Sequence, residues 1–142
     1  MFVSDILKNK GADVFAVSGG KTVRSVLSIL QEKNIGALIV GDGGKPSGIL
    51  SERDIVHLLA KEGAEALDRS VESVMTRKVV TCSPSDTIDS VMTKMTRGRF
   101  RHVPVVDESG ALVGLVSIGD IVKHRIAETE KEAEALKQYI AT

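Results

Sequence analysis

The sequence is poor in several residue types that particular classes of protein need. It has one cysteine, Cys82, so the chain cannot close an internal disulfide, as is typical of a reducing compartment. Aromatic residues make up only 3%, which leaves few faces on which nucleic-acid bases could stack. Lys and Arg number 19, and so do Asp and Glu, so no net charge attracts a phosphate backbone. These shortages argue against a disulfide-stapled or nucleic-acid-binding protein.

Long apolar runs and targeting features are also missing. No run approaches the roughly 18 apolar residues of a membrane span. The segment Met1–Asp5 lacks the basic and apolar regions of a signal peptide. Apolar residues (42%) and charged residues (27%) are balanced as in a folded globular domain rather than a disordered chain. We therefore expect a soluble, cytoplasmic protein without membrane contact.

The chain contains an internal repeat. Gly48–Val56 recurs as Gly114–Val122, at an offset of 66 residues (114 − 48). An apolar run precedes each copy at the same offset, Ala37–Val40 and Val103–Val106. Two unrelated βα units of similar composition would not be expected to share so many features in one order. The repeat therefore predicts a duplicated unit.

Each copy predicts the same order of elements. A short β-branched segment, 13–17 or 79–82, precedes a helix whose N-cap is Thr22 or lies in the cluster 85–87. An apolar strand, a glycine-containing turn and a second strand follow. A second helix then begins, which gives β-α-β-β-α twice.

These elements predict an α+β fold in three parts. Residues 1–66 form the first unit, residues 67–125 the second, and residues 126–142 a helical tail rich in Glu, Ala and Lys. A unit of about 60 residues cannot bury its sheet alone, so the two should pack about a pseudo-twofold axis and leave two clefts. The tail has a solvated charged face, and a narrow apolar stripe on it could receive a partner helix: Ile126, Ala133, Leu136 and Ile140.

The repeated Gly-x-x-Ser-x-x-Asp-Ile-Val pattern resembles the end of a CBS domain, and the whole chain resembles a tandem CBS pair, or Bateman module. The resemblance covers about residues 4–125. Arg101–Asp107 fits the central strand of the second unit, and Val74–Thr76 fits the family's usual lead-in to a unit. No catalytic domain is left over, so the chain is similar to small free-standing bacterial proteins of this type.

This resemblance implies an adenine-nucleotide ligand in the clefts and a regulatory, non-enzymatic role. Ligands across the family are AMP, ADP, ATP, NAD(H) and S-adenosylmethionine, and AMP is the first expectation. An Asp at a helix start can accept both ribose hydroxyls, and a Ser three residues earlier can donate to a phosphate. Arginine presents a planar fork that matches phosphate oxygens. The resemblance also implies a homodimer and a regulated protein target that the sequence leaves unknown. His57, His102 and His124 are not spaced as a metal set, and no second ligand lies near Cys82 in the sequence, so we expect no metal.

The resemblance assigns residues to each cleft. One cleft would use Leu115, Ser117, Gly119 and Asp120, with Phe15, Asn34, Ile35 and Gly36 as the opposite wall. The other would use Ile49, Ser51, Arg53 and Asp54, facing Met75, Val80, Phe100, Arg101 and His102. Because Arg53 corresponds to Gly119, and Arg101 to Ile35, we expect unequal sites.

Other interpretations stay open for several of these residues. Each Ser-x-x-Asp frame could be only a helix cap, a role compatible with ligand contact. Arg101 is expected to point into its cleft, and Arg97 and Arg99 outward. A phosphate-binding loop ending at Lys21 would need glycine where Phe15 stands, so a turn is favoured there.

Two other classes of function compete with the nucleotide sensor. The chain could be an interaction adaptor that acts through its helices while its clefts stay empty. An enzyme acting on a nucleotide would need a nucleophile and base, which the sequence does not suggest.

Overall fold

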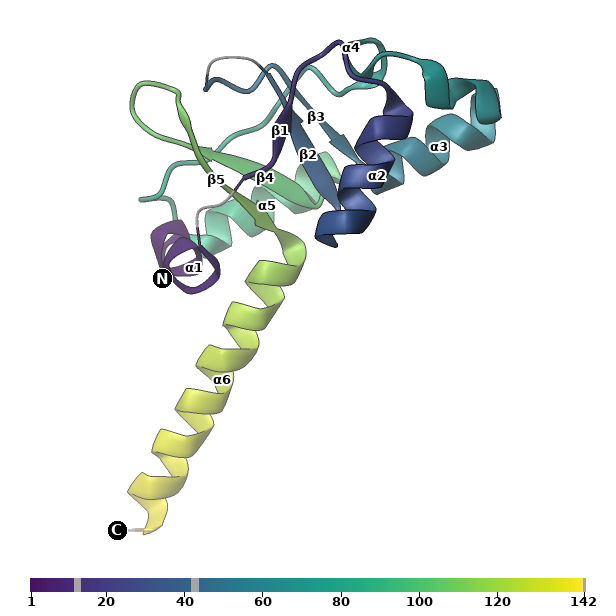
Figure 1. Ribbon diagram of the computed structural model, residues 1–142. Helices are drawn as coiled ribbons and strands as arrows, with labels where there is room; N and C mark the ends of the chain where they lie inside the picture. The colour runs from purple at the N-terminus through teal and green to yellow at the C-terminus, as the bar shows by residue number, and fades with distance from the viewer. Residues whose placement is uncertain (12–13, 42–43, 142) are drawn as a thin grey trace.

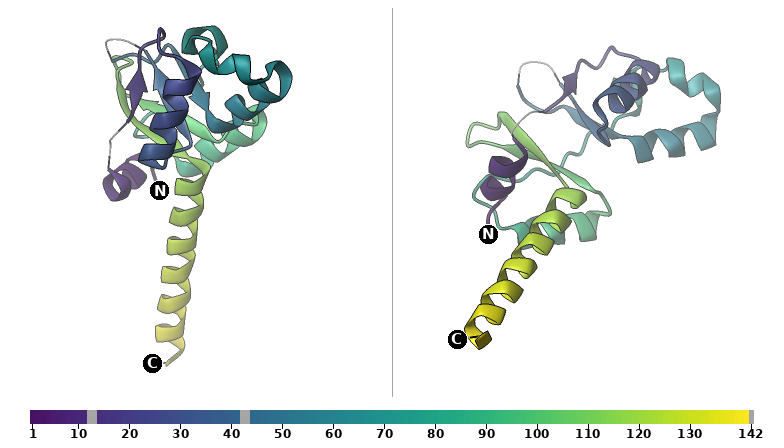
Figure 2. Two further views of the ribbon diagram at one scale, coloured as in Figure 1. Left: turned by 45° about the vertical axis from the view of Figure 1, so that its right-hand side comes forward. Right: turned by 60° about the horizontal axis from the view of Figure 1, so that its bottom comes forward.

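A computed structural model describes residues 1–11, 14–41 and 44–141. Two small sheets, each flanked by helices, lie side by side, and one long helix leaves the body as a rod (Figures 1 and 2). The predicted mixture of helices and strands is confirmed.

The first unit contains a three-stranded sheet. Strands β1 (Ala16–Val17), β2 (Ala37–Val40) and β3 (Gly48–Ser51) follow one another in the sheet. β1 runs parallel to β2, which pairs antiparallel with β3. All four residues of β2 are buried, so both faces of this strand are covered. The helices α2 (Val23–Lys33) and α3 (Glu52–Glu62) turn their apolar stripes to the same core.

The second unit has a two-stranded hairpin. Strand β4 (His102–Val106) pairs antiparallel with β5 (Leu112–Ser117), and α5 (Ile88–Gly98) and α6 (Ile118–Ala141) flank them. The strand predicted at 79–82 is reduced to one parallel bridge between Cys82 and Val105. Cys82 is buried, and this burial raises the pKa of its thiol to about 11. The thiol is therefore a protonated core group.

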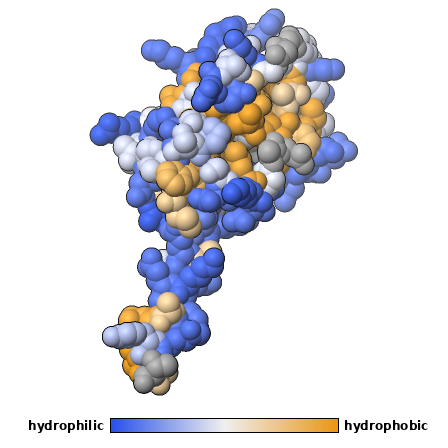
Figure 3. Space-filling model, turned by 90° about the vertical axis from the view of Figure 1, so that its left-hand side faces the viewer, coloured by the Kyte–Doolittle hydropathy of each residue, from blue (hydrophilic) through white to orange (hydrophobic). Residues whose placement is uncertain are grey.

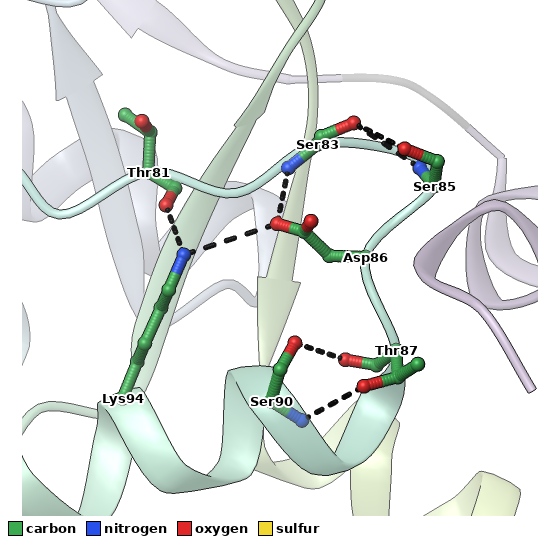
Figure 4. A network of polar contacts seen from close by, with 7 residues as sticks. All are labelled: Thr81, Ser83, Ser85, Asp86, Thr87, Ser90 and Lys94. Carbon is green, nitrogen blue, oxygen red and sulfur yellow. Dashed lines mark hydrogen bonds and ion pairs between the residues drawn. The ribbon is translucent and has the colours of Figure 1, made fainter.

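A polar network takes the place of a longer strand before α5 (Figure 4). Lys94 Nζ donates to the Thr81 carbonyl at 3.0 Å, and the Ser83 N–H donates to Asp86 Oδ2 at 2.8 Å. At the helix start Thr87 Oγ1 accepts from the Ser90 N–H at 3.1 Å. The N-cap expected in this cluster is thus Thr87.

Short segments carry the chain between the two cores. Helix α1 (Val3–Lys10) buries Val3 and Ile6 in the core of the second unit. The 3-10 helix η1 (Ala64–Asp68) is followed by α4 (Val71–Val74), whose Val71 is buried in the core of the first unit. The chain thus crosses twice between the units, and the unit boundary at residue 66 stays a prediction.

Helix α6 projects beyond the body as the sequence predicts (Figure 1). Ile121 in its first turns is buried, whereas every residue from 129 to 141 is exposed. In the part of the chain that the structure describes, no helix has both the length and the apolar character to cross a membrane.

Candidate functional site

One cavity lies where the two units meet, and its volume is about 200 Å³. Its walls come from β3 and α3 of the first unit and from the segment before β4 of the second. The structure brings together most residues predicted for this cleft: Ile49, Ser51, Arg53, Asp54, Val80, Phe100, Arg101 and His102.

The base of the cavity is the start of α3. The Ser51 N–H donates to Asp54 Oδ2 at 3.0 Å, and the Asp54 N–H donates to Ser51 Oγ at 3.1 Å. This reciprocal pair is a capping box, so the structural interpretation of the frame is confirmed. No bond to Asp54 Oδ1 is formed within the described residues, so a carboxylate oxygen stays available to a ligand hydroxyl.

Cationic side chains surround this base. Arg53 and Arg101 line the cavity, together with Lys78 and Arg99. Arg99, expected to point outward, is exposed and also borders the cavity. It is the C-cap of α5 with a left-handed backbone (φ 56°). Positive charge at a helix N-terminus is an arrangement that suits a phosphate.

His102 lies in the wall between the two units. Burial lowers the pKa of its imidazole, although the negative charges of Asp120, Glu52 and Asp54 act in the opposite direction. The side chain is therefore neutral at pH 7 and can donate one hydrogen bond and accept another. A Cβ placed on Gly36 would lie 3.3 Å from His102 Nε2, so the glycine permits this close approach.

A segment between the units closes the other side of the cavity. Thr76 and Ile49 exchange two backbone hydrogen bonds, of 2.9 and 3.0 Å, which hold Thr76 against β3. Lys78, Val79 and Val80 continue along the wall. The bond from Lys94 to the next residue, Thr81, holds the far end of this segment (Figure 4).

The second Ser-x-x-Asp frame has the same local geometry in different surroundings. The Ser117 N–H donates to Asp120 Oδ2 at 2.8 Å, and the Asp120 N–H donates to Ser117 Oγ at 3.2 Å. Here, however, Lys10 Nζ also lies 2.7 Å from Asp120 Oδ2 and 2.8 Å from the Leu115 carbonyl. A cation of this chain thus lies against Asp120 Oδ2, the oxygen that also accepts from Ser117, whereas no bond to Asp120 Oδ1 is formed within the described residues.

Electrostatics favour this ion pair. Burial by itself would raise the pKa of Asp120, but hydrogen bonds from Lys10 and Ser117 outweigh it and hold the pKa below its usual range. Asp120 is consequently ionised at neutral pH, and its side chain is only 18% exposed.

Comparison with known proteins identifies the repeat. A family model for the CBS domain matches residues 3–61 and again residues 71–127. The chain belongs to the CBS-domain family. Its two units are therefore CBS domains, as the sequence indicates.

Solved CBS structures have the same fold. The CBS-domain protein ATU1752 of Agrobacterium tumefaciens is 45% identical with a TM-score of 0.82, over 87% of this chain and 98% of that one. The CBS pair of MJ0100, solved with methylthioadenosine and S-adenosylmethionine, is 29% identical with a TM-score of 0.80, covering 90% and 98%. PAE2072 of Pyrobaculum aerophilum, solved with AMP, is 27% identical with a TM-score of 0.76, covering 84% and 89%. These matches confirm the predicted α+β fold.

Several residues predicted for the clefts of the CBS pair lie elsewhere. Met75 does not line the first cavity and lies over Gly48 instead. Gly36, expected opposite Asp120, lines the first cavity. Asn34 and Ile35 border a separate depression beside α2.

Phe15 and Gly119, also expected in the second cleft, contact neighbouring residues of this chain. Phe15 is 38% exposed, with Lys33 Nζ 5.6 Å from its ring centre. A Cβ on Gly119 would lie 3.6 Å from Ser117 Oγ, so this glycine lies in van der Waals contact with the capping side chain of α6. Contact of these residues with a ligand stays a prediction.

The sequence interpretation missed part of the first cavity, namely Glu52, Thr76, Lys78, Val79, Arg99 and Pro104. Arg99 could have been found, because it aligns with Asn34 at an offset of 65 (99 − 34) and both are left-handed helix C-caps. Thr76 had no such signal, since its bridge to Ile49 is a long-range contact.

Proposed function

We propose that this CBS pair is a regulatory module that binds an adenosine ligand in the cavity between its units. AMP is the first candidate, followed by ADP, ATP, NAD(H) and S-adenosylmethionine. The observation that carries the proposal is a capped carboxylate, Asp54, at the base of an inter-unit cavity ringed by arginines. The AMP complex of PAE2072 and the S-adenosylmethionine complex of MJ0100 support it.

Each part of the ligand has a matching surface in this proposal. The adenine lies between apolar side chains such as Ile49 and Val80, with backbone groups at its edge. The ribose hydroxyls donate to Asp54. The phosphate lies at the start of α3, with Arg53 and Arg101 as charged donors.

Regulation would follow from a ligand that touches both units. Asp54 belongs to the first CBS unit, whereas Phe100 and His102 belong to the second. A ligand that contacts both favours the relative orientation in which all contacts are made, and it shifts the population by its difference in affinity. We propose that a homodimer in the cytoplasm passes this change to a target protein without catalysis.

The two clefts are proposed to be unequal. In the second, the Asp120 carboxylate is paired with Lys10 at 2.7 Å, whereas Asp54 in the first has no ion pair within the described residues. Binding in the second cleft must displace that lysine or recruit it toward a phosphate. The first cleft is therefore the tighter site.

Thermal unfolding with a panel of AMP, ATP, NADH and S-adenosylmethionine tests the function. A ligand present at about 100 times its Kd should add about 2.7 kcal/mol of stability. Arg101→Gln should reduce the shift, whereas Arg97→Gln, an exposed arginine outside the cavity, should preserve it. Absence of a shift with every ligand would refute the function, and equal shifts in both variants would refute the location.

A further inference from the structure

Helix α6 exposes apolar side chains along the rod that leaves the body. Val122 is 48% exposed, Ile126 54%, Leu136 59% and Ile140 74%. The space-filling view shows apolar surface near the far end of the rod, bordered by hydrophilic atoms (Figure 3). Exposure of large aliphatic side chains on an isolated helix is unfavourable, because such a helix gains most of its stability from packing.

These side chains follow a heptad pattern. The residues Val122, Ile126, Thr129, Ala133, Leu136 and Ile140 are separated alternately by four and three residues. This spacing places them in one narrow stripe along the helix, as in the seam of a coiled coil. Ile121 of the same helix is buried in its own core, and at about 100° per residue it lies roughly a quarter turn from the stripe. The stripe therefore lies outside the face of α6 that packs on the body.

We propose that α6 binds α6 of a second copy of this chain in a parallel, in-register, two-stranded coiled coil. The inner positions favour two strands, because β-branched Ile126 and Ile140 alternate with Leu136. The stripe from residue 122 to 140 is long enough for about 27 Å of contact at 1.5 Å per residue. This pairing is independent of any nucleotide in the clefts.

The charges beside the stripe specify the parallel orientation. In this arrangement a residue just before the seam faces the residue five positions later on the other helix. Glu132 would then face Lys137 of the second copy, and Arg125 would face Glu130 of the second copy. Both pairs are attractive, although Arg125 also forms an ion pair with Asp89 of its own chain. Glu132 and Lys137 thus carry most of the specificity.

The antiparallel alternative is repulsive. Full overlap of two antiparallel stripes places Val122 opposite Ile140 of the second copy. It brings Glu132 near the same residue of the second copy, and likewise Glu130. Like charges facing each other across a helix pair are destabilising. The charge pattern therefore selects the parallel pair over the antiparallel pair.

Disulfide cross-linking of the full chain tests the pairing and its orientation. Ile140→Cys places a thiol in the seam, and Gln138→Cys places one on the outer face of the same turn as the control. The native Cys82 is buried and present in both variants, so any cross-linking through it is the same background rate in each. Under mild oxidation at micromolar protein, Ile140→Cys should form covalent dimers at least about tenfold faster than Gln138→Cys, because paired thiols have effective concentrations on the order of mM.

Two combinations complete the test. Adding Leu136→Asp, at an exposed site, should remove the advantage of Ile140→Cys without unfolding the chain. In the Ile140→Cys background, Glu132→Lys should slow cross-linking, and Lys137→Glu added to Glu132→Lys should restore it. Glu134→Lys, outside the seam, should have little effect. Equal rates for the two cysteine variants, or rates unchanged by Leu136→Asp, would overturn the proposal. A dimer by mass without the Ile140→Cys cross-link would indicate another interface and would overturn it as well.

Discussion

A lysine is one residue that makes the surroundings of the two Ser-x-x-Asp frames differ. The capping geometries of Asp54 and Asp120 are nearly the same, with Ser51 and Ser117 in matching roles. Only Asp120 has an internal cation on its carboxylate, because Lys10 reaches it from α1. The duplicated chain thus carries two copies of one frame in different electrostatic environments, and this difference supports the proposal of unequal sites.

Removing the lysine charge should open the second cleft. Lys10→Met keeps the length of the side chain and leaves the Asp120 carboxylate without its ion pair. We expect calorimetry with the ligand found by thermal unfolding to show one binding event per chain for the native protein and a second event for Lys10→Met. Lys8→Met, an exposed site on the same helix, is the control. Two equal sites in the native protein, or weaker overall binding by Lys10→Met, would contradict this prediction.

Helix starts organise this molecule at the level of its elements. Side-chain caps begin α2, α3 and α5, through Thr22, Ser51 and Thr87. The cap of α3 also forms the base of the cavity, whereas the cap of α5 is formed by Thr87, which does not line the cavity. Capping can therefore be tested at α5 without disturbing the proposed site.

Loss of the Thr87 hydroxyl should destabilise α5. Thr87→Ala removes the acceptor of the Ser90 N–H, and we expect the free energy of unfolding to fall by about 1 kcal/mol. Thr87→Ser keeps the hydroxyl and should retain most of that stability. Urea denaturation followed by circular dichroism measures both variants. If the two were equally destabilised, the methyl group of Thr87 rather than its cap would be responsible.

At the scale of the whole molecule, one of the two cores includes a segment from the far end of the chain. The N-terminal helix α1 closes the core of the second unit with Val3 and Ile6, and α4 closes the core of the first with Val71. Backbone bonds also join the units, among them the Leu112 N–H to the Gly44 carbonyl at 2.8 Å. The core of the second unit is thus incomplete without α1, which precedes the first unit in the chain, and we expect both units to unfold together.

Truncation of one crossing side chain should weaken the whole molecule. Ile6 is 4% exposed, and Ile6→Ala should cost about 2–5 kcal/mol through lost burial and a residual cavity. We expect one calorimetric transition, shifted to lower temperature. Val56→Ala, at a site 64% exposed, should shift it much less. Two separate transitions for Ile6→Ala would show that the units unfold independently.

Local patterns in the sequence were enough to predict the duplication, the order of most elements, the N-cap at Thr22, the projecting helix and the paired Ser-x-x-Asp frames. These features depend on periodicity and on contacts between neighbours in the chain, which local residue types specify. The same local rules failed at 79–82. There the carbonyl of Thr81, which a strand would use for backbone pairing, accepts a hydrogen bond from Lys94 of α5.

Which groups share a cavity could be seen only from the tertiary structure. Lys10 meets Asp120 across 110 residues, and Gly36 lies against His102 because two units pack there. Arg99 borders the cavity from a left-handed C-cap that its side-chain type does not predict. Such contacts arise from the packing of whole elements, whose relative positions depend on the entire core rather than on any local pattern.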